Sequence, residues 1–129
     1  MKTYFYAASI ILALAGSVQA GPFQYECTIE RMYKDDGSSV DGLLKMYQDN
    51  KVYIERDTGL ITHPYWVTQR SDVASLAVLH KGDASTYYKS ITHTVAGIMI
   101  AVTVKEFAQG NKKPMALVEN GKVMTGYCY

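Results

Sequence analysis

The C-terminal stretch MALVENGKVMTGYC, residues 115–128, decides the fold class of this chain. Its two halves are rich in residues that favour β-strands, and Asn120-Gly121 between them favours the positive φ angles of a two-residue hairpin turn. The stretch ends at Cys128, one of only two cysteines in the chain. We therefore predict strands at 115–119 and 122–127, joined as a hairpin that carries a cysteine at its end.

Similar short segments fill the chain before this hairpin. Turn-forming residues separate them at 35–39 and 57–59, and Pro64 falls inside one segment, which indicates a sheet edge or a bulge. One short helix is predicted from Asp41 to Tyr47. About seven or eight short strands with turns between them predict an all-β fold, an antiparallel small barrel or sandwich. The remaining predicted strands lie at 23–30, 52–56, 60–67, 73–79, 85–92 and 95–107.

Two of these strands predict where the core lies. Phe23, Tyr25, Cys27 and Ile29 alternate with polar residues, so this face of the first strand should point inward. The run 95–104 is apolar at nearly every position, which predicts a central strand covered on both faces.

The two cysteines, Cys27 and Cys128, lie near the two ends of the predicted domain. Cysteines of an exported chain meet an oxidising compartment and usually pair. We therefore predict one disulfide that places the first strand beside the last and closes the sheet.

Residues 1–20 have the pattern of a secretory signal peptide. A lysine at position 2 precedes an apolar run from Tyr4 to Ala15, and Val18-Gln19-Ala20 places small residues before a cleavage site at Gly21. The run is shorter than the ~20 apolar residues of a membrane-spanning helix. We expect one β-domain at 21–129, periplasmic or secreted, with no stable membrane insertion after signal cleavage.

The charge of the chain is nearly balanced. It carries 13 Lys and Arg against 12 Asp and Glu, and one of the lysines belongs to the signal. No basic field is therefore present to attract a phosphate backbone. Nucleic acid is not an expected partner.

Four short motifs lie in and beside the predicted strands: VYIERDTGLI at 52–61, TVKEF at 103–107, Lys113-Pro114 and Gly126-Tyr127-Cys128. In these motifs the chain resembles a group of small exported proteobacterial β-proteins with a cysteine near each end. The resemblance implies bacterial export and implies no functional residues. The opening Tyr25-Glu26-Cys27 is also similar to periplasmic inhibitors of C-type lysozyme, which are small disulfide-bonded barrels. Their Ser-Gly inhibitory loop and Trp-Lys-Gly stretch have no counterpart here.

The sequence contains none of the residue spacings that are typical of catalytic or metal-binding motifs. His63, His80 and His93 lie on separate segments, and none of the spacings places two ligands on one face. Histidines in loops such as His63-Pro64 and His80-Lys81 are usually solvated. We expect no catalytic residues, no metal site and no cofactor, and so no enzyme.

Aromatic side chains give the one indication of a binding surface. Two adjacent pairs occur, Tyr65-Trp66 and Tyr87-Tyr88. Neighbours in a strand point to opposite faces, so one ring of each pair should meet solvent, a loop or a ligand. The four residues are therefore candidate ligand-binding residues, although the same rings also fit the outer face of a sheet.

Three functions remain open on the sequence. We favour an exported, non-enzymatic binding or inhibitory module of the bacterial envelope, with a protein, a glycan or a small apolar ligand as its partner. The first alternative is a lipocalin-like carrier of an apolar small molecule, which needs a cavity lined by Ile98 and Ile100. The second is a small hydrolase or metalloenzyme, which needs two of the three histidines to meet a carboxylate in a cleft.

Overall fold

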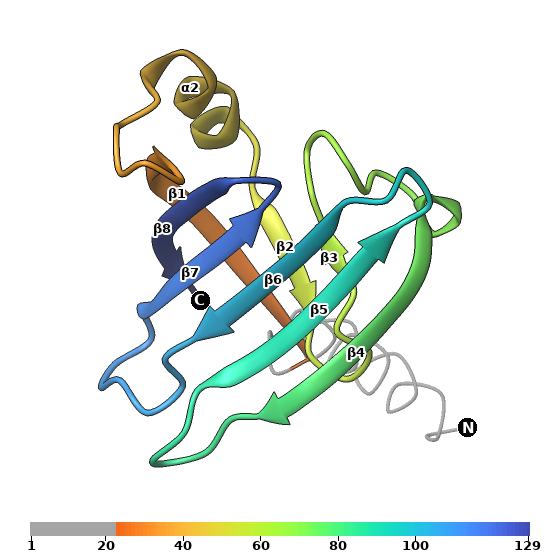
Figure 1. Ribbon diagram of the computed structural model, residues 1–129. Helices are drawn as coiled ribbons and strands as arrows, with labels where there is room; N and C mark the ends of the chain where they lie inside the picture. Colours follow the sequence, from red (N-terminus) through yellow and green to blue (C-terminus); the bar gives the residue numbers. More distant parts are fainter. Residues whose placement is uncertain (1–22) are drawn as a thin grey trace, which may run out of the picture.

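Eight antiparallel strands form one curled sheet, a half-barrel with the strand order β3-β2-β1-β8-β7-β6-β5-β4 (Figure 1). The structure is a computed structural model that describes residues 23–129, so the predicted signal at 1–20 and its cleavage site lie outside the described residues. In chain order the elements are β1 (Gln24–Lys34), α2 (Asp41–Asp49), β2 (Val52–Glu55), β3 (Ile61–Thr62), the 3₁₀ helix η2 (Arg70–Asp72), β4 (Val73–Lys81), β5 (Tyr88–Thr94), β6 (Met99–Val104), β7 (Lys113–Glu119) and β8 (Lys122–Cys128).

This architecture confirms the predicted all-β class with one short helix. The strands belong to a single sheet, which selects the barrel-like alternative over the sandwich. The C-terminal hairpin is confirmed, with Asn120 at φ 41° and Gly121 at φ 77° in the turn. The predicted helix is also confirmed and extends to Asp49.

The first and last strands lie side by side, as predicted. Cys27 pairs with Cys128 across β1 and β8, with 4.0 Å between their Cα atoms, and a disulfide joins them. Both cysteines are fully buried. The neighbouring Glu26 and Tyr129 exchange two backbone hydrogen bonds, so the ladder continues past the disulfide. A buried disulfide of this kind fits a protein that resides outside the cytoplasm.

A β-bulge in β1 turns the sheet and changes which residues face inward. The register between β1 and β8 shifts between Ile29 and Arg31. Tyr25, Cys27 and Ile29 are buried before the shift, and Met32 is buried after it. Gly126 lies opposite Ile29, where a Cβ atom would stand 1.9 Å from the Thr28 carbonyl oxygen. Only glycine permits this close approach of the two backbones.

The core occupies one face of the sheet, which corrects two predictions. On β6, Ile100 and Val102 are buried, but Met99 on the opposite face is 48% exposed, so no second layer covers that face. The prediction that this strand is covered on both faces is therefore wrong. Phe23 is 66% exposed because it precedes β1, so the inward face of that strand begins at Tyr25.

The predicted strand at 60–67 is also wrong in its length, since β3 spans only two residues. Pro64 has no N–H to donate to a ladder, and the chain turns at this point. The β3 edge of the sheet is connected to β5 by hydrogen bonds of the Thr92 side chain. The Thr92 hydroxyl accepts a hydrogen bond from the Ile61 N–H at 3.1 Å and donates one to the Gly59 carbonyl at 3.0 Å. This contact brings the β3 edge of the half-barrel against β5.

Removal of the disulfide by Cys27→Ala with Cys128→Ala should lower the free energy of unfolding by about 4–5 kcal/mol. The bond joins residues 101 positions apart and so restricts nearly the whole unfolded chain. Urea denaturation of the double variant and of the oxidised parent measures the difference. A loss below about 1 kcal/mol would contradict the view that the bond closes the fold.

A matched pair of glycine variants tests the β1–β8 contact. Gly126→Ala should destabilise the protein by about 3 kcal/mol or more, because its Cβ has no room beside Thr28. Gly42→Ala in α2 meets no atom within 4 Å and should stabilise the helix by up to about 1 kcal/mol. Thermal melts of the two variants should therefore shift in opposite directions.

Candidate functional site

A pocket of ≈ 240 Å³ opens between α2, the loop that follows β3, and the β7–β8 hairpin. In Figure 1, α2 and the turn of this hairpin lie at the same end of the sheet. We call this site the α2 pocket and define it by the six residues that line it: Leu43, Tyr47, Tyr65, Trp66, Glu119 and Lys122.

Local sequence places these side chains together. Leu43 and Tyr47 are four residues apart on α2, so they lie on the same face of the helix. The tight Asn120-Gly121 turn pairs Glu119 directly with Lys122. Glu119 continues the inward alternation of β7 after two buried apolar residues. The helix and the hairpin therefore bring an apolar wall and a carboxylate to one pocket.

His63, in the loop after β3, supports the pocket from behind. It is fully buried, which corrects the expectation of a solvated loop histidine. Its Nδ1 atom accepts hydrogen bonds from the backbone N–H groups of Tyr65 at 3.1 Å and Trp66 at 3.3 Å. The ring proton is therefore on Nε2, which lies 3.1 Å from the Tyr47 hydroxyl. Burial, together with the positive charge of Lys122, lowers the pKa of His63 to about 4.

Glu119 is a buried carboxylate that the fold holds only loosely. Its side chain is fully buried, and neither carboxylate oxygen accepts a hydrogen bond of normal geometry. The Lys122 ammonium forms a long ion pair with it, 3.7 Å from Oε1, and the His63 Nε2 atom lies 3.5 Å from Oε2. Burial raises the pKa of Glu119, and Lys122 and the Trp66 side chain oppose this shift. Buried carboxylates normally accept hydrogen bonds, so this one is unusual.

The four aromatic residues predicted as ligand-binding lie in two different places. Tyr65 and Trp66 line the α2 pocket, and Tyr65 is 41% exposed. They lie in a turn, so the strand alternation used to predict them does not apply there. Tyr88 is fully buried, whereas Tyr87 is 39% exposed and packs edge-on against Phe107.

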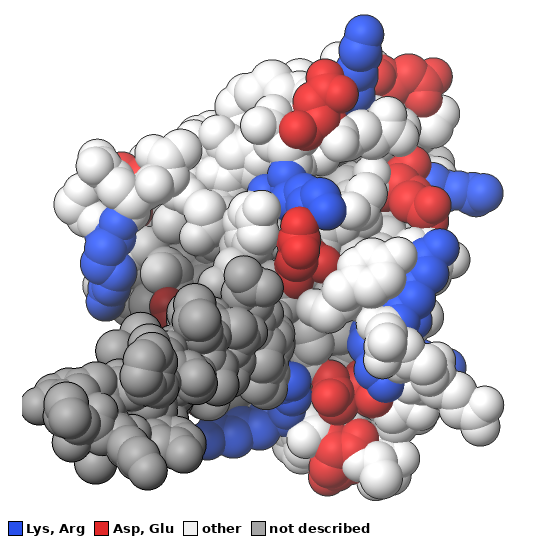
Figure 2. Space-filling model, turned by 180° about the vertical axis from the view of Figure 1, so that it is seen from behind, with Lys and Arg blue, Asp and Glu red and all other residues white. Residues whose placement is uncertain are grey.

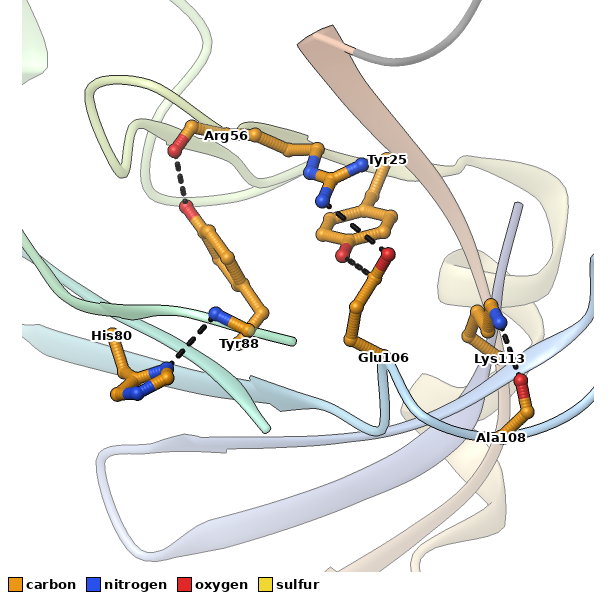
Figure 3. Close-up of polar contacts among 8 residues, drawn as sticks. Tyr25, Arg56, His80, Tyr88, Glu106, Ala108 and Lys113 are labelled. Carbon is orange, nitrogen blue, oxygen red and sulfur yellow. Dashed lines mark hydrogen bonds and ion pairs between the residues drawn. The ribbon is translucent and has the colours of Figure 1, made fainter. Parts of the chain in front are cut away.

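A second polar cluster lies where β1 begins, away from α2 (Figure 3). The Tyr25 hydroxyl donates a hydrogen bond to Glu106, and the Arg56 guanidinium lies 3.4 Å from the other carboxylate oxygen and 4.6 Å from the centre of the Tyr25 ring. Tyr88 donates to the Arg56 carbonyl at 3.2 Å. Burial and the hydrogen bond to Glu106 raise the pKa of Tyr25. Each polar group has a partner here, so the cluster joins β1, the end of β2 and the end of β6.

The three histidines do not converge. His80 and His93 are exposed and lie at the two ends of the β4–β5 ladder. His80 pairs with Lys89, and His93 pairs with Ser75. Among residues 23–129, no group of three or more His, Cys, Asp or Glu side chains is placed to hold a metal ion. Ile98 and Ile100, the predicted lining of a carrier cavity, pack in the core, and neither lines any of the four surface pockets described.

Sequence reasoning missed four of the six lining residues, Leu43, Tyr47, Glu119 and Lys122, and also the supporting role of His63. Glu119 alone had a visible indication, because it stands in phase with Met115 and Leu117 in an alternating strand. No local pattern predicts that His63 is buried, since its burial depends on α2 packing over the loop.

The chain matches no protein-family model, no curated protein and no solved structure. Within residues 23–129, no helix has both the length and the apolar character needed to cross a membrane.

We expect His63 to make the protein less stable as the pH falls from about 6.5 to 4. The unfolded chain takes up the histidine proton near pH 6.5, whereas the native state does so only near pH 4. Native protein thus loses up to roughly 3 kcal/mol of stability across this window. Glu119 acts in the opposite direction, because its raised pKa favours the native state as the pH falls.

The matched variants His63→Asn and His63→Ala isolate the histidine. The side-chain oxygen of the introduced asparagine can accept hydrogen bonds from the two N–H groups that donate to Nδ1. This variant should therefore fold and lose the histidine's contribution to the pH dependence, while that of Glu119 remains. Alanine leaves both N–H groups unpaired and should cost at least about 2 kcal/mol more than asparagine at pH 7.5. Urea denaturation from pH 4 to 7.5 measures both effects. Equal pH slopes in the parent and in His63→Asn would contradict the assignment.

Proposed function

We propose that the protein is an exported, non-enzymatic binding module of the bacterial envelope, periplasmic or secreted, and that the α2 pocket is its binding site. One observation carries the proposal. Leu43 and Tyr65 are 36% and 41% exposed, and both line a pocket that also reaches the fully buried Glu119. Exposed apolar side chains around a buried polar group are typical of ligand sites.

The geometry of His63 supports binding rather than catalysis. A general base must reach its substrate, and His63 is fully buried. Its Nδ1 atom is engaged by two backbone N–H groups, and its Nε2 atom faces Tyr47 and Glu119. In this arrangement the histidine holds the loop and orients the pocket wall.

The disulfide supports the proposed location, and the charge distribution supports a partner other than nucleic acid. A buried disulfide is stable in an oxidising compartment. Lys and Arg side chains alternate with Asp and Glu side chains over the face seen in Figure 2, so no basic surface is present there to favour nucleic acid.

A matched pair of surface variants tests the function. Leu43→Lys places a positive charge at the pocket rim, whereas Leu79→Lys places one on β4 at a residue that is 60% exposed. Each form is recovered from the producing cell, and the molecules that accompany it are identified by mass spectrometry. We expect a molecule that accompanies the parent and Leu79→Lys and is reduced at least about tenfold with Leu43→Lys, since a charge in an apolar contact is costly.

Thermal melts first establish that both variants fold. If no accompanying molecule distinguishes Leu43→Lys from Leu79→Lys, the α2 pocket is not the binding site and the proposal fails.

A further inference from the structure

We propose that the α2 pocket binds an organic ammonium ion, with Glu119 as its counter-charge. This inference rests on the proposed function and adds the chemical class of the ligand. It depends on two independent features of the pocket, namely a buried carboxylate that accepts no hydrogen bond and the aromatic walls.

The carboxylate selects the charge of the ligand. Glu119 is fully buried and accepts no hydrogen bond within the described structure. A neutral ligand would leave the charge of this carboxylate to the long ion pair with Lys122, and an anion would add repulsion. A cation compensates it. His63 does not compete for this role, because its Nδ1 atom accepts two backbone N–H groups and the ring is neutral.

The walls select the kind of cation. Tyr47, Tyr65 and Trp66 all line the pocket, and the rings of Tyr47 and Tyr65 are 5.5 Å apart between centres. Aromatic faces attract cations, and clusters of such rings favour alkylated ammonium groups, which need few hydrogen bonds. A metal ion would need several oxygen or nitrogen ligands, and no such group was found among residues 23–129.

Lys122 holds the place of this cation in the unliganded protein. Its ammonium lies 3.7 Å from Glu119, beyond a normal hydrogen bond, and its side chain is 26% exposed. A lysine ammonium is strongly hydrated, so a partly dry aromatic pocket suits it less well than it suits an alkylated cation. The flexible lysine stem lets the ammonium move outward when a ligand enters. Lys122 therefore competes with the ligand for Glu119.

Three probes of nearly the same shape test the charge preference: choline, its neutral isostere 3,3-dimethylbutan-1-ol, and the anion 3,3-dimethylbutanoate. Trp66 is the only tryptophan of the chain and lines the pocket, so its fluorescence reports binding directly. We expect choline to bind at least about tenfold more tightly than the alcohol, and the anion to bind more weakly than both.

Variants then test the role of each charge. Glu119→Gln keeps the shape of the side chain and should reduce choline binding to the level of the alcohol. Lys122→Met removes the competing ammonium and should increase the affinity for choline at least about threefold. Glu30→Gln, an exposed carboxylate on β1, is the matched control and should leave all three affinities unchanged.

Thermal melts provide a second readout. Lys122→Met leaves Glu119 without its nearest lysine, so this variant should have a lower Tm than the parent and recover it when choline is added. Failure of choline to raise the Tm of Lys122→Met would indicate a purely structural ion pair and overturn the inference.

The remaining outcomes separate this inference from the proposed function. Equal binding of choline and the alcohol overturns the ammonium preference and leaves the α2 pocket as a binding site. Tightest binding of the anion overturns it in favour of recognition by Lys122. If none of the probes changes Trp66 fluorescence, the inference fails, and the recovery experiment with Leu43→Lys and Leu79→Lys decides the proposed function separately.

Discussion

The pairing of β1 with β8 is the constraint on which the rest of the structure depends. Cys27 and Cys128 are 101 residues apart, and the disulfide between them joins two strands whose pairing closes a long loop at a high cost in chain entropy. β1 also pairs with β2 through Gln24–Cys27, so this one strand connects the β2–β3 edge to the C-terminal strands. Once β1 and β8 are joined, the remaining strands from β4 to β7 follow as consecutive antiparallel neighbours.

The two ends of the half-barrel differ in how their buried polar groups are satisfied. Where β1 begins, Tyr25, Arg56 and Glu106 satisfy one another in a closed network (Figure 3). At the α2 end, Glu119 accepts no hydrogen bond, and its ion pair with Lys122 is long, at 3.7 Å. A buried charge that is only partly compensated destabilises a fold. Such groups persist where function needs them, which supports placing the proposed site at the α2 end.

Local patterns predicted the elements of this chain and left their long-range relations open. The Asn120-Gly121 turn and the alternation around Tyr25 and Cys27 were sufficient to identify a hairpin and an inward strand face. The bulge at Ile29 was not predictable, because its cause is the close approach of Gly126 from the other end of the chain. The outer face of β6 was misjudged because apolar residues there resemble a second buried face.

The buried polar residues of the sheet differ in whether they have hydrogen-bond partners within the chain. Thr92 and Thr94 are both buried, but each hydroxyl has a partner within the chain: Thr92 bonds Ile61 and Gly59, and Thr94 accepts the Ile98 N–H at 2.9 Å. These hydroxyls hold loops against the sheet and explain why polar residues occur inside β5. Ser90 also lacks a partner, but an unpaired neutral hydroxyl costs much less than an unpaired carboxylate. Glu119 is therefore the one buried polar side chain, among residues 23–129, whose charge is both costly to the fold and directed at an open pocket.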